Sequence, residues 1–512
     1  KFYHHGCPAC EQPLAGRGLP RGVTGVQLFF CGLASTYEAE HIARMFFPGA
    51  KLAQRRCAPG QPCVRVRKAG ARVLCGVRTA GQCAVKVFRL PDGAGPKEEE
   101  YAVCRALYLL LQAQTGTRPP WGMLTGVRPV RLVHDLRRKG LSPAQQQAFF
   151  CQRNDVSEEK YKLAVEIANN QQDVINHNSL WSYSLYISIP FCPSRCSYCS
   201  FVSTTTEKSG ALVAPYLEKL EQELQSIAAM AEKLHLRLET VYIGGGTPTA
   251  VSAQQLAHLM AAVRGAFDFS HVREFTVEAG RPDCTTPEKL AAIREGGATR
   301  ISINPQTLSD EVLRAIGRRH TAQDVVDCFA AARKAGHRNI NMDLIAGLPL
   351  DTPAGFEKSL AGVLALSPEN VTVHTLTLKR ASNLVMQAAP PAYGDVAQMV
   401  QHSIGALQRA GYSPYYLYRQ KGTLQNLENT GWAKPGFAGL YNIYIMEEVH
   451  TILSAGAGGS TKLVGPAGRI ERVFNHKYPL DYLNHFDEVL ARKQKIEDFY
   501  GKWFDLDSET AG

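Results

Sequence analysis

The amino-acid sequence predicts an α/β protein built on an open barrel of six strand–helix units. An N-terminal α+β domain and a small C-terminal α/β domain flank this barrel. From residue 184 onwards, short β-branched runs alternate with helical segments of 10–20 residues, as in parallel sheets. The runs are almost continuously hydrophobic, which is typical of strands buried on both faces. Six such runs are present rather than eight, so an open barrel fits better than a closed eightfold one.

The predicted barrel strands are 185–190, 240–244, 274–278, 300–303, 339–345 and 370–378. The predicted helices between them are 214–234, 253–267, 287–296, 310–316 with 322–335, and 353–366. Because strands and helices alternate, the carboxyl ends of all six strands should lie at one end of the barrel. Barrel enzymes carry out their chemistry at that end.

The regions outside the barrel are less regular. Residues 1–115 predict an α+β domain, with β-like runs at 25–30, 72–77 and 83–90 and an amphipathic helical pattern at 98–112. Residues 116–183 predict a helical connector that starts with the turn-rich joint 118–122. The barrel is then expected at 184–410, and a Tyr- and Gly-rich C-terminal domain at 411–512.

Composition indicates a soluble cytoplasmic protein. Of 512 residues, 45% are hydrophobic and 20% are charged, which argues for buried cores and against disorder. No run approaches the ~20 apolar residues that span a bilayer. The first residues carry no secretory signal, and the missing initiator Met indicates a truncated or processed chain.

The positive charge is concentrated in the N-terminal third. Residues 1–185 hold 25 Lys and Arg against 13 Asp and Glu, whereas the remaining residues hold 32 against 33. Such asymmetry predicts an anionic partner for this third, either nucleic acid or a polycarboxylate ligand. The alternative is a solvated basic surface, which is favoured because no named nucleic-acid motif is visible.

The chain has 14 cysteines, nine of them before residue 152. A disulfide framework suits small secreted domains, so free thiols and a metal site are the better interpretations. Cys7 and Cys10 have CxxC spacing, but no second pair completes a four-ligand zinc site there.

The strongest motif is a group of three cysteines, Cys192, Cys196 and Cys199, directly after the first predicted strand. Their CxxxCxxC spacing suits a [4Fe–4S] cluster, because three thiolates bind three irons and leave the fourth open to a small molecule. A structural zinc ion would need a fourth ligand, and no nearby Cys or His supplies one.

Other predicted strand ends carry groups suited to a ligand. The run 244–249 (GGGTPT) follows the second strand, and its glycines allow backbone amides to approach a bound molecule. Glu278, Gln306 and Asp343 each stand at the end of a β-like run, where ribose hydroxyls or an amino group could bind. Taken singly, each could instead be a helix cap or part of a turn.

With these motifs, the chain resembles the radical S-adenosylmethionine (SAM) superfamily over about 184–420. Within it, the chain resembles the oxygen-independent coproporphyrinogen III oxidase family and, most closely, its HemZ branch. The matching motifs are 186–192 (YISIPFC), 244–249, Gln306 and 341–349 (NMDLIAGLP). Residues 1–183, including 121–129 (WGMLTGVRP), look like the extension of the HemZ branch, as does 414–421 (PYYLYRQK) near the C-terminus.

The resemblance implies roles for individual residues. Cys192, Cys196 and Cys199 would bind the cluster. The SAM that chelates the open iron would be bound by Tyr186, Gly245, Glu278, Gln306, Arg318 and Asp343. A second SAM molecule would be bound by Tyr198, Gly246 and Thr247. The resemblance assigns no catalytic side chain.

The implied activity is the oxidative decarboxylation of coproporphyrinogen III propionates to vinyl groups, which gives protoporphyrinogen IX in anaerobic haem biosynthesis. A reductant such as flavodoxin or ferredoxin would supply electrons. A substrate with four propionates needs cationic partners, which Arg provides by bidentate pairing. The basic N-terminal third could contribute Arg128, whose alternative role is to cap a turn.

The sequence departs from this family in two places. The oxidases carry a fourth cysteine where this chain has Phe201, as the related haem-chaperone branch does. The haem motif of that branch (HNxxYW) is also absent, because the corresponding stretch 441–446 (YNIYIM) has neither His nor Trp. A haem- or porphyrin-binding chaperone and another radical SAM tetrapyrrole enzyme, such as an anaerobic haem-opening methyltransferase, are the alternatives.

Overall fold

The computed structural model describes residues 25–53, 60–79, 82–199, 201, 203–377, 394–420 and 422–504. Cys7 and Cys10 lie outside these residues. The chain forms two compact units, the smaller with the described residues of Lys1–Pro129, Leu136–Leu163 and Gln425–Leu427. The larger contains those of Val130–Asp135, Ala164–Leu424 and Glu428–Gly512. Within the described ranges, every helix is too short or too polar to cross a membrane.

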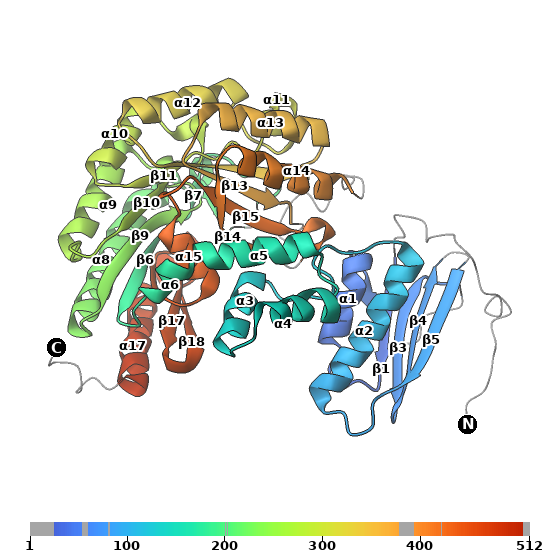
Figure 1. Cartoon of the computed structure of the whole chain (residues 1–512). Coiled ribbons are helices and arrows are strands. Elements are labelled where there is room, and N and C mark those ends of the chain that lie inside the picture. The colour runs from blue at the N-terminus through green and yellow to red at the C-terminus, as the bar shows by residue number, and fades with distance from the viewer. Residues whose placement is uncertain are drawn as a thin grey trace. The chain divides into compact units, whose positions relative to one another are not determined.

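The larger unit is built on an eleven-stranded sheet whose six central strands are parallel neighbours in chain order (Figure 1). These strands are β6 (Ser182–Ile189), β9 (Arg237–Gly245), β10 (Glu274–Glu278), β11 (Arg300–Ser302), β12 (Ile340–Ala346) and β13 (Asn370–Thr375). They correspond to the six predicted strands, and the predicted six-unit partial barrel is confirmed. Because all six run the same way, their carboxyl ends lie on one side of the sheet.

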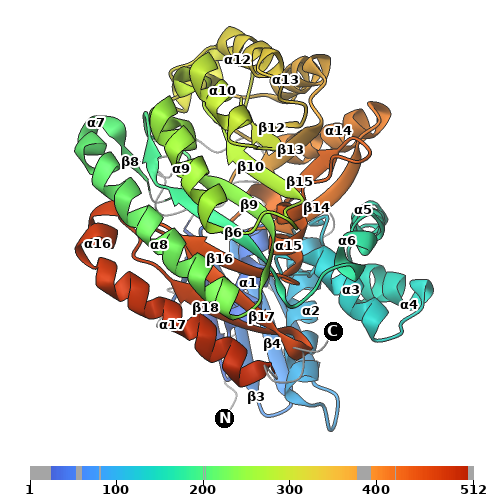
Figure 2. The same ribbon diagram turned by 90° about the vertical axis from the view of Figure 1, so that its left-hand side faces the viewer.

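Helices follow the strands and cover the outer side of the curved sheet (Figure 2). They are α8 (Val213–Lys233), α9 (Ala253–Ala266), α10 (Pro287–Glu295), α11 (Asp310–Ala315), α12 (Ala322–Lys334) and α13 (Pro353–Leu366). Several begin at a Ser or Thr whose hydroxyl accepts a backbone N–H two or three residues into the helix: Ser252, Thr286, Ser309, Thr321 and Thr352. These caps fix where each strand–helix loop ends.

Residues from the C-terminal region extend both edges of the barrel sheet. On one edge, β15 (Glu428–Ala433) pairs antiparallel with β13, and β14 (Ser413–Arg419) pairs with β15. On the other, β16 (Thr451–Ala455) pairs parallel with β6 and is followed by β17 (Ser460–Gly465) and β18 (Arg469–Phe474). The region that the sequence analysis separates as residues 411–512 thus shares one sheet with the barrel.

The remaining helices of the larger unit pack around this sheet. They are α14 (Asp395–Arg409), α15 (Leu440–Glu447), α16 (Pro479–Asn484) and α17 (Phe486–Trp503). Helix α17 carries Lys493, whose ammonium bonds the buried Glu223 carboxylate of α8 at 2.6 Å. Glu223 also accepts the backbone N–H of Gly456 at 2.7 Å, so this buried pair holds the loop at the carboxyl end of β16.

Helices make up most of residues 129–176. They are α3 (Pro129–Arg138), α4 (Pro143–Gln147), a π-helix (Ala148–Arg153), α5 (Glu158–Asn170) and α6 (Gln172–Asn176). The last part of this segment is bonded into the larger unit. Gln171 donates to the Tyr415 carbonyl at 2.9 Å, and Asn170 donates to the Pro414 carbonyl at 2.8 Å. A fragment that starts after this segment would lose both bonds.

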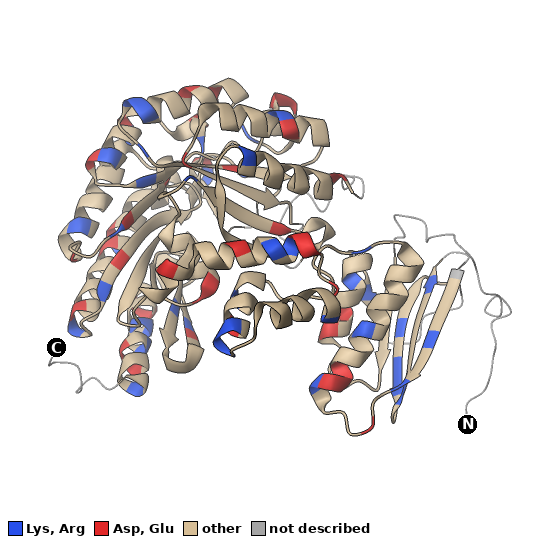
Figure 3. Ribbon diagram, viewed as in Figure 1, with Lys and Arg blue, Asp and Glu red and all other residues tan. Residues whose placement is uncertain are grey.

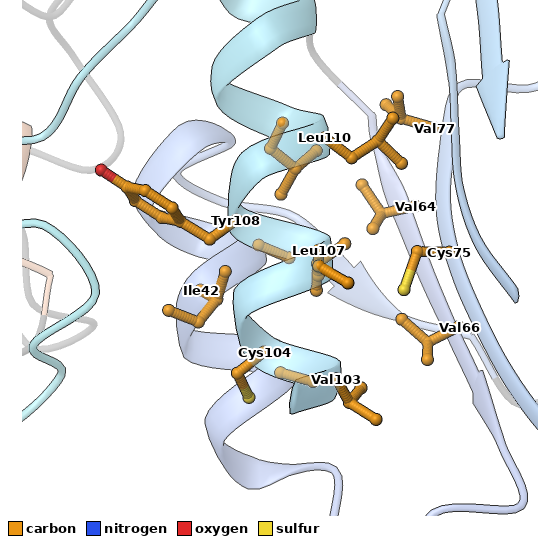
Figure 4. Packing of buried hydrophobic residues seen from close by; sticks show 14 of the residues in the cluster. Ile42, Val64, Val66, Cys75, Val77, Val103, Cys104, Leu107, Tyr108 and Leu110 are labelled. Carbon is orange, nitrogen blue, oxygen red and sulfur yellow. The ribbon is translucent and has the colours of Figure 1, made fainter. Parts of the chain in front are cut away.

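The smaller unit has a five-stranded sheet in the order β2-β1-β3-β4-β5. The strands are β1 (Gln27–Cys31), β2 (Lys51–Leu52), β3 (Cys63–Ala69), β4 (Arg72–Thr79) and β5 (Gln82–Arg89). Helices α1 (Tyr37–Phe46) and α2 (Pro96–Thr115) cover one face of this sheet. Figure 4 shows Leu107 of α2 among Val64, Val66 and Cys75 of the strands. Neither β3 nor α1 is among the elements that the sequence predicts.

Candidate functional site

The three motif cysteines lie in one loop after the first barrel strand. Cys192 ends the short strand β7 (Phe191–Cys192), which pairs with β8 (Thr204–Thr205). The Cys199 amide donates to the Cys196 carbonyl at 3.2 Å, so the chain turns back on itself between them. Burial raises the pKa of the Cys199 thiol, and the nearby Cys196 and Cys192 sulfurs raise it further. The loop therefore brings the three thiols into mutual electrostatic contact.

Three thiols in one loop suit a [4Fe–4S] cluster, because such a cluster binds three thiolates through three separate irons. Among the residues that the structure describes, no three His, Cys, Asp or Glu side chains are placed to hold one metal ion together. Phe201, at the position of the fourth cysteine of the oxidases, is 69% exposed.

The glycine-rich run after β9 packs directly against the cysteine loop. The Gly246 amide donates to the Ile189 carbonyl and the Thr247 amide to the Phe191 carbonyl, both at 2.8 Å. The Thr247 hydroxyl donates to the Cys192 Sγ at 3.5 Å. A Cβ at Gly246 would lie 3.0 Å from that sulfur, so only glycine permits the approach. Gly245 has a φ of +114° and therefore also favours glycine.

Arg318 connects the cysteine loop to two strand ends. It follows α11 and is buried. Its Nη2 donates to the Tyr198 hydroxyl at 3.2 Å, and its Nη1 donates to the Asn304 carbonyl at 2.7 Å and more weakly to the Gly280 carbonyl at 3.4 Å. Its buried Nε has no hydrogen-bond partner among the described residues. Such a group is suited to a ligand's oxygen, because an unpaired buried donor is costly.

Gln306 and Asp343 are joined through their backbones. Gln306 has a φ of +69°, and its amide donates to the Asp343 carbonyl at 2.9 Å. In the part of the chain that the structure describes, the buried Gln306 Oε1 has no partner. The Asp343 carboxylate accepts from the Asn341 side-chain amide at 2.7 Å and lies 3.6 Å from the His374 Nε2. Burial raises the pKa of Asp343, but His374 and Asn341 outweigh it, so the net shift is downward.

Glu278 ends β10 inside the barrel. Its Oε1 accepts from the Tyr242 hydroxyl at 2.6 Å. Burial raises the pKa of Glu278 to about 7; the Tyr242 hydrogen bond and Arg300 oppose this rise, and Asp343 adds to it. This carboxyl therefore exchanges a proton near neutral pH.

A stack of tyrosines lines the barrel next to Glu278. Tyr186 of β6 lies 6.0 Å from Tyr242 of β9 and 6.2 Å from Tyr441 of α15, measured between ring centroids. Tyr242 and Tyr441 are 4.5 Å apart. The predicted SAM-contacting Tyr186 thus stands in an aromatic wall that two unpredicted tyrosines complete. Such a wall excludes water from this part of the barrel interior.

Arg281 is the functional candidate that sequence reasoning missed. It lies three residues beyond the end of β10, in the same strand-end loop that Glu278 begins. Its Nη1 lies 3.6 Å from the Cys196 Sγ and donates to the Ser194 carbonyl at 3.0 Å. Asp283 accepts from its Nε and Nη2 at 2.9 and 2.6 Å. The only sequence signal for Arg281 was its position in a loop that follows a barrel strand. The contact between its guanidinium and the Cys196 sulfur comes from the folded structure.

The structure therefore groups the predicted residues around the cysteine loop and the strand ends. Gly246 and Thr247 contact Cys192, and Tyr198 contacts Arg318. Gln306 joins Asp343, while Tyr186 and Glu278 meet at Tyr242. Arg128 belongs to the smaller unit together with the rest of Lys1–Pro129.

Comparisons with known proteins identify the family of the chain. Residues 186–361 match the model of the radical SAM superfamily. The chain is 39% identical to the oxygen-independent coproporphyrinogen-III oxidase-like protein HemZ of Bacillus subtilis (strain 168), over 77% of this chain and 80% of that protein. It is 30% identical to the heme chaperone HemW of Lactococcus lactis subsp. lactis (strain IL1403), over 62% of this chain and 79% of that protein.

Among solved structures, the coproporphyrinogen III oxidase HemN from Escherichia coli, a radical SAM enzyme, matches with a TM-score of 0.50. The match covers 66% of this chain and 74% of that one at 23% identity. At this level of identity, the likeness establishes the shared fold.

Proposed function

Because the chain belongs to the HemZ-like family of oxygen-independent coproporphyrinogen-III oxidase-like proteins, within the radical SAM superfamily, we propose that it oxidatively decarboxylates coproporphyrinogen III. Two propionates would become vinyl groups, giving protoporphyrinogen IX. The observation that carries this proposal is the 39% identity to HemZ over 77% of the chain. The cofactors of the superfamily are a [4Fe–4S] cluster and SAM, and they are the cofactors of this protein.

The residues at the site fit both cofactors. Cys192, Cys196 and Cys199 would hold the cluster, since the three thiols lie in one loop after the first barrel strand. Two buried atoms without a hydrogen-bond partner among the described residues, Oε1 of Gln306 and Nε of Arg318, offer one acceptor and one donor to SAM. Tyr186, Gly245, Glu278 and Asp343 would complete the SAM site. Tyr198, Gly246 and Thr247, which line the cysteine loop, would contact a second SAM molecule.

When bound, the reduced cluster and SAM supply the carbon-centred radical that removes a hydrogen atom from an unactivated carbon. The protein's own side chains position the reactants and exclude water. Gly245 and Gly246 allow the backbone to approach the cofactors closely, and the tyrosine stack shields the barrel interior. Glu278, with its pKa of about 7, offers a carboxyl that can bind as acceptor or donor at neutral pH.

The proposed reaction needs two external electron carriers. Each propionate loses one hydrogen atom, one CO₂ and one further electron on its way to a vinyl group. An acceptor must therefore take up that electron, and a reductant such as flavodoxin or ferredoxin must reduce the cluster.

The second candidate is a haem- or porphyrin-binding chaperone, which the 30% identity to HemW and Phe201 favour. The stretch that corresponds to the HemW haem motif forms part of α15. Tyr441 there is buried in the tyrosine stack, and Tyr444 donates its hydroxyl to Glu239 at 2.7 Å. With both rings engaged and no His in the helix, this segment lacks the His and Trp of that haem motif. The enzyme is therefore the better candidate.

An anaerobic assay on the reconstituted full chain tests the proposal. Coproporphyrinogen III, SAM, a limiting amount of chemical reductant and a one-electron acceptor are supplied, and 5′-deoxyadenosine, CO₂ and oxidised porphyrin products are followed together. We expect 5′-deoxyadenosine and CO₂ to form in equal amounts, and neither to form with the Cys199→Ala variant. If 5′-deoxyadenosine forms with haem but not with coproporphyrinogen III, the protein is another radical SAM tetrapyrrole enzyme. Tight haem binding without SAM cleavage would indicate that the protein is a haem chaperone.

A further inference from the structure

The sheet of the smaller unit carries basic residues and no acidic ones on its strands. No Asp or Glu occurs in β1 to β5, and Figure 3 shows blue positions without red on this sheet. The seven basic residues of its three longest strands are Arg65, Arg67, Lys68, Arg72, Arg78, Lys86 and Arg89. The positive charge of the N-terminal third is thus partly concentrated on one sheet.

Strand alternation sorts these residues between the two faces of the sheet. Val64 and Val66 of β3 and Val73 and Cys75 of β4 point into the core under α1 and α2. Residues between them therefore point away from the helices. On this outer face lie five arginines, Arg65, Arg67, Arg72, Arg78 and Arg89. Both lysines, at positions 68 and 86, fall on the helix side instead.

Apolar side chains stand between the arginines of the outer face. Across the strands, Arg67 pairs with Leu74 and Leu74 with Val87. In the next row, Arg65 pairs with Phe29 of β1, and its guanidinium lies 5.9 Å from the Phe29 ring centroid. Val87 is 62% exposed and the neighbouring Val85 is 51% exposed. The outer face is therefore a mixture of guanidinium groups and solvent-exposed apolar surface.

Three of these arginines, Arg67, Arg72 and Arg89, are exposed. Arg89 pairs with the exposed Asp92 at 3.3 Å. Arg67 and Arg72 have no ion pair with any residue that the structure describes. Among the described residues, the three exposed arginines thus have one acidic partner, and together they produce a positive potential that attracts anions.

From this face we infer that the smaller unit binds single-stranded RNA. The guanidinium groups would pair with phosphates, and Phe29, Leu74 and the exposed valines would lie under unstacked bases. An acidic protein would satisfy the charge, but it would not need arginine rather than lysine at all five positions. Arg also presents a flat face on which bases stack. This inference is independent of the proposed reaction, since no residue of the cysteine loop or the strand ends takes part.

Fluorescence anisotropy with a labelled, mixed-sequence RNA 12-mer tests it on the full-length protein. We expect charge reversal at Arg67, Arg72 and Arg89 (each →Glu) to weaken binding at least about tenfold. Because each single-strand phosphate contact contributes roughly 0.7 to the slope of log K against log salt, three lost contacts should lower that slope by about 2. The matched control reverses three exposed lysines of the same unit, Lys97, Lys139 and Lys162, and should bind within about twofold of wild type.

Three outcomes would overturn the inference. One is wild-type protein that does not bind the RNA at low salt, and another is a control that loses as much affinity as the arginine variant. The third is binding of poly-glutamate, single-stranded DNA or coproporphyrin in preference to RNA, which would assign the face to another anion. Because the arginine variant could fail to fold, cross-linking of wild-type protein to a 4-thiouridine RNA gives a second measurement. Cross-linked peptides should come from β1 and β3 to β5, and peptides only from elsewhere would refute the inference.

Discussion

Replacement of Arg281 by Gln should change both the stability of the barrel and the properties of the cluster. Arg281 is buried, with 4% of its side chain exposed, and it bonds to three residues. It pairs bidentately with Asp283, donates to the carbonyl and hydroxyl of Ser194, and lies 3.6 Å from the Cys196 sulfur. One side chain therefore links the strand-end loop of β10 to the loop that we assign to the cluster.

The expected loss of stability follows from the Asp283 carboxylate that the substitution leaves behind. Burial raises the pKa of Asp283, but the nearby His320 ring and the hydrogen-bonded Arg281 guanidinium outweigh it and hold the pKa well below its usual range. Removing one partner of a buried ion pair costs about 3–5 kcal/mol of unfolding free energy. The double variant Arg281→Gln with Asp283→Asn should recover part of this loss, because it leaves no unpaired buried charge.

The cluster provides a readout that a purely structural role would not change. Hydrogen bonds to cluster sulfurs stabilise the reduced, more negative state and raise the reduction potential. Arg281→Gln should therefore lower the potential measured by a reductive titration followed by electron paramagnetic resonance. Arg281→Lys, which keeps the charge, should lower it less.

Arg333→Gln is the matched control for both measurements. Arg333 pairs with Glu369 at 2.9 Å on the helical layer, remote from the cysteine loop in sequence and without a bond to any of its residues among those described. Its loss should reduce stability and leave the cluster potential unchanged. An unchanged potential in Arg281→Gln, at full iron content, would refute the assigned N–H···S contact. Equal shifts in both variants would show that the potential only reports general destabilisation.

Four further expectations concern the other site residues and Arg128. Alanine at any of the three motif cysteines should abolish the cluster in iron and sulfide analysis, and a full cluster in one variant would remove that cysteine from the ligand set. Gln306→Ala and Asp343→Ala should each weaken SAM binding by calorimetry about tenfold or more; unchanged affinity with a lowered melting temperature would indicate a structural role. Because the pKa of Glu278 is raised to about 7 in the folded chain, this carboxyl favours folding at low pH and loses that contribution as pH rises from about 5 to 7. The melting temperature of Glu278→Gln minus that of wild type should therefore be larger at pH 8 than at pH 5. An equal difference at both pH values would contradict the raised pKa of Glu278. If Arg128 pairs with a propionate, Arg128→Ala should weaken coproporphyrinogen binding about tenfold and leave SAM binding unchanged. Unchanged coproporphyrinogen binding would indicate that Arg128 only stabilises a turn.

The barrel could be predicted because its strands are buried on both faces and its helices begin at clear caps. All six strands and the helices between them follow from uninterrupted apolar runs and from residues such as Thr321 and Thr352. Strand β3 was missed because Val64 and Val66 alternate with Arg65 and Arg67, which looks like a charged surface segment. Its identity as a strand follows from its pairing with β1 and β4, which the pattern of β3 alone does not reveal.

The site residues that belong to a short sequence motif could be predicted. Those that come together only through tertiary contacts could not. The cysteines and the glycine run are adjacent in sequence to the strands that place them. The tyrosine stack instead joins β6, β9 and α15, so Tyr441 comes within 4.5 Å of Tyr242 from a region nearly 200 residues away. The flanking strands β15 and β16 pose the same difficulty, because their pairing with β13 and β6 depends on partners that no local pattern identifies.

The bonds around the cysteine loop come from the protein itself, so we expect them to hold the loop when the cluster is lost. The Ser197 amide donates to the Ile316 carbonyl at 3.0 Å, and the Ser194 hydroxyl donates to the Gly317 carbonyl at 3.3 Å. Arg281 holds the loop from β10, and Arg318 holds it through Tyr198. These anchors come from segments that fold with the barrel, so loss of the cluster removes a ligand from a formed site. Cluster loss by oxygen should for that reason be reversible on anaerobic reconstitution, unlike the unfolding that follows metal removal from small zinc domains.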